Sequence, residues 1–102
     1  MQKDKHKTIV IFRRFRKGGD VLALFPELPG TNAWYKDCLS YQTIGQHSDA
    51  SVDIDLYTTL ANADNYKALK KELEDIGYNL KVVLNFNAEH LTARKRAVEK
   101  VK

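Results

Sequence analysis

The stretch Thr8-Ile-Val-Ile-Phe-Arg-Arg-Phe-Arg-Lys-Gly-Gly-Asp-Val-Leu-Ala-Leu-Phe25 decides the fold. Its first half is dense in β-branched and aromatic residues, which favour strands. Gly18 and Gly19 then stand between two apolar runs, and such a pair is a hairpin signal because glycine accepts positive φ without penalty. We therefore predict a strand over 8–16, a tight turn, and a returning strand over 20–25.

Two further strands are expected after the hairpin. Pro26 lacks an N–H donor and should end the returning strand, and a third strand is predicted over 37–44. Residues 45–61 have a weak apolar pattern, which favours a loop with a short edge strand or extended segment around 52–56. A last strand is predicted over 78–86, with Leu80, Val82, Leu84 and Phe86 on one face.

Two helices complete the predicted elements. Apolar residues spaced by three and four positions predict a helix over 66–76, with Asn62 or Asp64 as its N-cap. Gly77 stands where a left-handed C-terminal residue is expected. Asn87 would cap a terminal helix, whose thin apolar stripe is Leu91, Val98 and Val101.

The element order β-β-β-α-β-α predicts an α+β fold, a two-layer arrangement of an antiparallel sheet with a helix packed on one face. At 102 residues we expect one domain, 1–102, in which 1–7 form a flexible basic tail. No apolar run is long enough to span a bilayer, and no cleavage site for a signal peptide is present. We therefore expect no contact with membranes. The single cysteine, Cys38, cannot form an internal disulfide, which fits a reducing cytoplasm.

Basic residues gather near both ends of the chain. Residues 1–17 hold seven Lys and Arg against one acid, and residues 90–102 hold five against one, whereas 18–89 are acidic. If both groups share a surface, they would bind nucleic acid weakly and without sequence preference. The side chains expected to do so are Arg14, Arg16, Arg94, Lys95 and Arg96. The alternative is that these charges only keep the chain soluble.

The polar segment Cys38-Leu-Ser-Tyr-Gln-Thr-Ile-Gly-Gln-His-Ser-Asp-Ala-Ser51 begins like a strand and ends like a loop over 45–49. Exposed aromatic residues are favoured anchors for a partner, so we expect this loop and the preceding aromatic pair to recognise another protein. The residues expected to bind are Trp34, Tyr35, Gln46, His47 and Asp49. Within the loop, His47 is expected to satisfy backbone groups rather than to react.

Catalytic readings of this segment are weaker. A metal-dependent hydrolase or nuclease would use His47 with Asp49 and Asp53, but neither the HExxH nor the EF-hand spacing occurs. A nucleophilic Cys38 would lie about 30 Å from His47 along one strand, at roughly 3.3 Å per residue. We therefore predict no catalytic residue, no metal and no cofactor, and the sequence favours a protein that is not an enzyme.

Two resemblances add a biological setting. Phe25-Pro-Glu-Leu-Pro-Gly30 after a hairpin resembles HicB-type antitoxins, which implies binding to a toxin. The match departs from that family at 31–37, which are inserted before Cys38, and in having no DNA-binding module. The order Leu24-Phe-Pro-Glu27, Cys38-Leu-Ser-Tyr41 and Gly45-Gln-His47 looks closer to a group of small uncharacterised proteins from bacterial, phage and mobile-element genomes.

The leading hypothesis is a non-enzymatic accessory or binding domain that recognises another macromolecule in a bacterial or mobile-element system. The alternatives are a HicB-like antitoxin that binds its toxin through 25–30 and the metal-dependent hydrolase centred on His47. An unpaired edge strand would also allow a homodimer by sheet extension.

Overall fold

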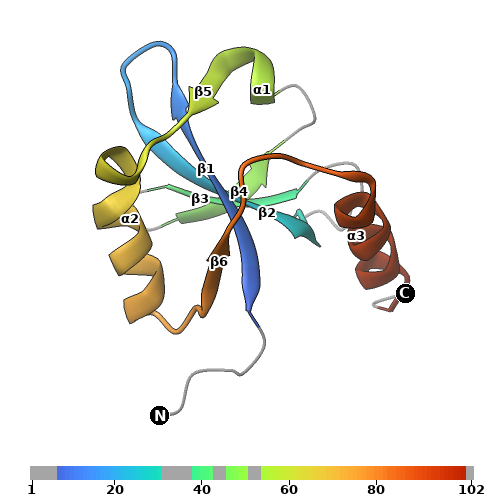
Figure 1. Cartoon of the computed structure of the whole chain (residues 1–102). Helices are drawn as coiled ribbons and strands as arrows, with labels where there is room; N and C mark the ends of the chain where they lie inside the picture. Colours follow the sequence, from blue (N-terminus) through green and yellow to red (C-terminus); the bar gives the residue numbers. More distant parts are fainter. Residues whose placement is uncertain (1–6, 31–37, 43–45, 51–53, 101–102) are drawn as a thin grey trace.

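The computed structural model describes residues 7–30, 38–42, 46–50 and 54–100, so nearly all of the expected N-terminal tail lies outside the described residues. Helices pack on a largely antiparallel sheet (Figure 1), which confirms the predicted α+β class. The elements are β1 (Thr8–Phe15), β2 (Val21–Pro29), β3 (Cys38–Gln42), β4 (Gln46–Ala50), α1 (Ile54–Tyr57), β5 (Thr58–Leu60), α2 (Ala63–Asp75), β6 (Leu80–Val82) and α3 (Ala88–Lys100).

Strand β1 organises the sheet. Within the described residues the strand order is β4-β3-β2-β1-β5, and each neighbouring pair is antiparallel. One edge of β1 is shared by two partners. Its first half pairs in parallel with β6, where Thr8 lies opposite Leu80, and its second half pairs with β5, where Arg13 lies opposite Leu60.

The predicted β1–β2 hairpin is confirmed. Gly18 and Gly19 have φ values of 83° and 75°, the left-handed region that glycine adopts at low cost. A Cβ at Gly19 would lie 2.9 Å from Arg14 Nη2, but that guanidinium is the end of a flexible side chain and can move aside, so the positive φ is what favours glycine there. The turn fixes the register in which Ile11 lies opposite Leu24.

Alternation along the hairpin builds a hydrophobic core on each face of the sheet. One core is covered by α2, and α3 lies on the opposite side of the sheet, where it packs along β2 (Figure 1). The first core consists of Val10, Phe12, Ala23, Phe25, Tyr41, Ala61, Leu69 and Leu73. The second consists of Ile11, Leu22, Leu24, Cys38 and Ala50. Each fully buried Leu or Phe contributes about 1.5–3 kcal/mol, so the hairpin supplies much of the stability.

Helix α2 begins where the sequence predicts. The Asn62 side chain accepts a hydrogen bond from the Asn65 backbone N–H at 2.9 Å, and the Asn65 side chain accepts one from the Asn62 N–H at 3.1 Å. This reciprocal capping box satisfies two otherwise unpaired donors. Tyr66 stacks on Phe12 with ring centroids 4.3 Å apart, and Gly77 follows the helix with a φ of 117°.

The structure corrects the prediction for the middle of the chain. Residues 46–50 form strand β4 rather than a loop, because their backbone pairs with β3 and Ser40 Oγ hydrogen-bonds to the Ser48 carbonyl at 3.0 Å. Residues 54–57, expected to be extended, form helix α1, which leads directly into β5. Nothing in the apolar pattern marks these two short elements, since tertiary pairing rather than local propensity holds them.

Strand β2 and the C-terminal elements also differ from expectation. β2 continues through Pro26 by a register shift, a position where a sheet tolerates proline, and pairs again at Pro29. β6 is short, and Leu84 beyond it is exposed. On α3, Val98 of the predicted stripe is buried beside His90 and Arg94, whereas Leu91 is exposed and Val101 lies outside the described residues. No helix among the described residues is both long and apolar enough to cross a membrane.

Candidate functional site

Two large apolar side chains stand in solvent on helix α1. Leu56 is 71% exposed and Tyr57 is 63% exposed. Beside them is a surface hollow of about 430 Å³ lined by Phe15, Arg16, Lys17, Leu56 and Tyr57. We call these five residues the Tyr57 surface. Its lining is mostly apolar, and its cations come from the end of the hairpin.

The Tyr57 surface is held in place by hydrogen bonds behind it. Arg13 donates to Thr58 Oγ1 and to the Thr58 carbonyl, both at 2.8 Å. The buried Thr58 hydroxyl donates in turn to the Ile54 carbonyl at 2.9 Å, and the Arg16 N–H donates to the Tyr57 carbonyl at 3.0 Å. A four-residue helix is unstable alone, so these bonds to β1 are what position its exposed side chains.

Positive charge surrounds one side of this surface. Arg14, Arg16 and Lys17 are exposed, and Asp20 is an exposed acid just after the turn. Arg14 donates through Nε to the Gly19 carbonyl at 3.3 Å, which keeps its guanidinium at the turn. Arg16 and Lys17 make no ion pair with any of the described residues, so their charges are available to a partner.

The sequence prediction missed Leu56 and Tyr57. Residues 52–56 alternate between apolar and acidic side chains, and this alternation favoured a short edge strand or an extended loop. The only sequence signal for this surface was the basic run from Arg13 to Lys17, which contributed Arg14 and Arg16 to the predicted nucleic-acid contacts.

His47 lies in β4 and belongs to an aromatic cluster on the α2 face of the sheet. Its Nε2 is 2.9 Å from the Tyr78 hydroxyl, and its ring meets Tyr41 edge-on with centroids 4.8 Å apart. Tyr78 stacks on Phe25 at 5.0 Å. Because one ring nitrogen is engaged and the ring is half-buried, His47 acts here as a packing and hydrogen-bonding residue.

Tyr41 connects this cluster to an acid on α2. Burial raises the pKa of the Tyr41 phenol, and the neighbouring Glu72 carboxylate raises it further. Burial also raises the pKa of Tyr78. Glu72 Oε2 is buried and accepts no hydrogen bond within the described part of the chain. The neutral phenol is therefore the favoured form of Tyr41.

The other residues predicted to bind a partner are only partly described. Trp34 and Tyr35 lie outside the described residues. The backbones of Gln46 and Asp49 pair with β3 as part of strand β4, and their side chains are not described. The structure therefore brings His47 onto a strand edge with these backbones, not into a loop.

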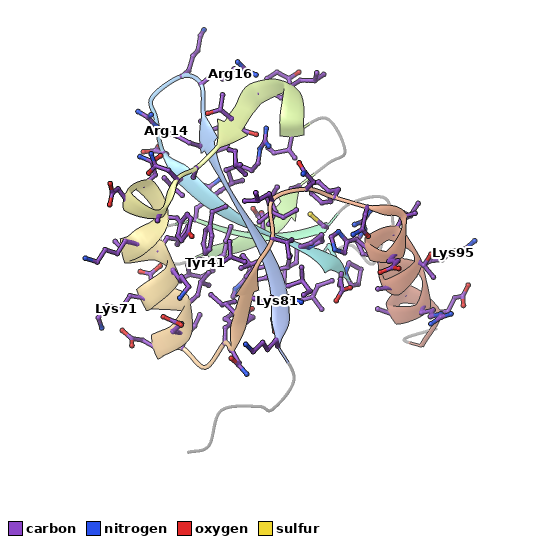
Figure 2. The ribbon with its side chains drawn as sticks, in the orientation of Figure 1. Arg14, Arg16, Tyr41, Lys71, Lys81 and Lys95 are labelled. Atoms are coloured by element: carbon purple, nitrogen blue, oxygen red, sulfur yellow. The ribbon has the colours of Figure 1, made fainter. Side chains whose placement is uncertain are left out.

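The predicted nucleic-acid residues do not form one surface. Figure 2 shows Arg16 at the hairpin end near α1 and Arg14 on the side of the hairpin toward α2, whereas Lys95 lies on the outer side of α3. Arg94 is buried, with 5% of its surface exposed, and its guanidinium donates to the Pro26 carbonyl in β2. Lys95 and Arg96 are exposed on α3. A helical wheel explains the difference, because Arg94 is four residues from both buried His90 and buried Val98.

A metal site at His47 gains no support from the described side chains. Among them, no three His, Cys, Asp or Glu gather as metal ligands. Asp53 and the Asp49 side chain, the other ligands of that hypothesis, lie outside the described residues. The Nε2 atom of His47 is already hydrogen-bonded to the Tyr78 hydroxyl.

No protein-family model, curated protein or solved structure matches the chain.

Proposed function

We propose that the protein is a non-enzymatic binding domain that recognises another macromolecule through the Tyr57 surface. The observation that carries the proposal is the exposure of Leu56 and Tyr57 over an apolar hollow beside Arg16 and Lys17. Leaving two such side chains in water forgoes burial energy, and contiguous apolar surface rimmed by polar groups is typical of interaction sites.

The composition and order of the Tyr57 surface support this role. Tyr and Arg are enriched among the residues that contribute most to binding energy at interfaces. The bonds from Arg13 and Thr58 hold α1 before any partner arrives, which lowers the entropy lost on binding. Trp34 and Tyr35 remain proposed contributors, as do Gln46, His47 and Asp49.

The proposed setting is the cytoplasm of a bacterium or a mobile-element system, in which the domain acts as an accessory factor. It is supported by the resemblance over Leu24–Glu27, Cys38–Tyr41 and Gly45–His47, and by a lone, buried Cys38 that fits a reducing compartment.

The antitoxin alternative is less well supported by the geometry. It requires the 25–30 segment to reach into a toxin, yet Phe25 and Pro26 are fully buried and Gly30 is buried. The Pro26 carbonyl is also bonded to Arg94 from α3. We therefore prefer the Tyr57 surface as the recognition site.

The experiment is affinity capture from cells of the native host with tagged variants of the full chain. Leu56→Glu should abolish capture of the partner, because it places a charge in the apolar hollow. Ile76→Glu is the matched control, since Ile76 is an exposed apolar residue at the far end of α2. Equal capture by both variants and the unmodified chain would show that binding does not use the Tyr57 surface.

A further inference from the structure

We propose that the partner of the Tyr57 surface is an acidic protein segment that inserts an apolar anchor side chain between Leu56, Tyr57 and Phe15. This inference rests on the proposed function and names the chemistry of its partner. Three features of the described residues lead to it: the lining of the hollow, the charge at its rim, and the position of Leu56.

The hollow is suited to an apolar side chain. Its volume of about 430 Å³ falls within the roughly 300–1,000 Å³ of ordinary ligand pockets. Its floor and walls come from Phe15, Leu56 and Tyr57, two aromatic rings and a branched aliphatic chain. A Leu, Phe or Trp anchor would remove this surface from water, as the central residues of protein interfaces do.

The rim selects for negative charge next to that anchor. Arg16 and Lys17 line the hollow, and both are exposed. Carboxylates flanking the anchor would pair with these cations, and the guanidinium of Arg16 can bind a carboxylate through two parallel hydrogen bonds. Such complementarity also speeds encounter with an acidic partner over other proteins in the cell.

Leu56 favours a protein segment over nucleic acid. A single strand would stack a base on Tyr57 and place phosphates on the cations, but an aliphatic side chain adds nothing to stacking. Leu56 is nevertheless the more exposed of the pair. Lys95 on α3 also lies apart from Arg16 at the hairpin in Figure 2, so these cations do not follow one phosphate track.

The test is selection of displayed random peptides on the immobilised full chain, followed by fluorescence anisotropy with the enriched peptides. We expect peptides in which Asp or Glu flank a Leu, Phe or Trp. Leu56→Glu should weaken their binding at least about tenfold, as should the double change Arg16→Glu/Lys17→Glu. Tyr57→Ser tests the apolar part of the surface without adding a charge. Circular dichroism checks that each variant is folded.

Matched controls separate local from general effects. Ile76→Glu introduces the same charge on another exposed apolar residue, and Lys67→Glu/Lys81→Glu makes the same change in net charge on exposed lysines of α2 and β6. Both should leave peptide affinity within about twofold, since charges away from the contact act weakly at physiological salt. Binding should also weaken as salt is raised from about 50 to about 500 mM.

Three outcomes would overturn the inference. The first is that no peptide is enriched, and the second is that the enriched peptides lack acidic residues. The third is that a fluorescent oligothymidine of about 20 nucleotides binds more tightly than any peptide, and that this binding is lost in Arg16→Glu/Lys17→Glu but kept in Leu56→Glu. If host capture still depends on Leu56 in any of these cases, the proposed function survives and only the partner's chemistry is wrong. If the variants of the Tyr57 surface change neither host capture nor peptide binding, the proposed function and the proposed partner are both refuted.

Discussion

Replacing His47 with alanine should lower the free energy of unfolding by about 2 kcal/mol. The hydrogen bond between its Nε2 and the Tyr78 hydroxyl, at 2.9 Å, accounts for about 1 kcal/mol net of solvation. The edge-on contact with the Tyr41 ring, at 4.8 Å between centroids, adds about 0.5–1.5 kcal/mol. At about 4–8 °C per kcal/mol for a domain of this size, Tm should fall by roughly 8–16 °C.

Urea denaturation of a double-mutant cycle isolates the hydrogen bond. His47→Ala and Tyr78→Phe are measured singly and together, and the coupling between them should be about 1 kcal/mol because each change alone removes the same bond. Tyr57→Phe is the control. It removes an exposed hydroxyl and should change stability by less than about 0.5 kcal/mol.

A different result would reassign His47. If His47→Ala leaves the unfolding midpoint unchanged while capture of the partner is lost, the residue belongs to a recognition surface along the β4 edge. A coupling near zero with a large single effect would instead mean that packing on Tyr41, not the bond to Tyr78, is what His47 supplies.

Three further outcomes test the rest of the fold. Arg94→Met should cost about 1–3 kcal/mol in a thermal melt, because the β2 carbonyl it serves is left unpaired, whereas the exposed Lys95→Gln should cost almost nothing. Asn62→Ala should cost about 1 kcal/mol in urea denaturation followed by helical circular dichroism, because the capping box of α2 is lost. Burial and then Glu72 raise the pKa of Tyr41 in the folded state above 10.0, its ordinary value in the unfolded chain. The contribution of this group to stability should therefore be constant below pH 10.0 and should be lost as pH rises toward the folded pKa. Urea midpoints at roughly pH 8 and pH 11 should therefore differ less in Tyr41→Phe than in the unmodified chain, and equal losses would contradict the argument.

Local signals were sufficient for the hairpin and the central helix. The turn of the hairpin needs positive φ, which Gly18 and Gly19 adopt, and Asn62 and Asn65 form the capping box that starts α2. The chemistry of a few adjacent residues therefore decides each of these elements. The class of the fold follows from these elements. It could be predicted because a hairpin and an amphipathic helix have few ways to bury their apolar faces.

Long-range contacts decide the features that the sequence did not reveal. β4 and α1 are set by pairing with β3 and by the Arg13–Thr58 bonds, across 45 residues in the second case. Arg94 was expected to be at the surface because of its charge, yet a carbonyl 68 residues away accepts its hydrogen bond. Tyr57 was missed for the converse reason, since an apolar residue that stays in solvent has the same pattern as one that is buried.

The two partners on one edge of β1 have a consequence for how the chain folds. The β1–β2 hairpin closes a short loop and can form early, but the partner of Thr8–Val10 is Leu80–Val82, near the other end of the sequence. Until those residues arrive, the apolar, β-branched start of β1 presents unpaired backbone groups, the kind of edge on which aggregation begins. Docking of β6 is therefore expected to be the slow step of folding, and yield during synthesis should depend more on how soon that parallel pair forms than on the strength of the hairpin.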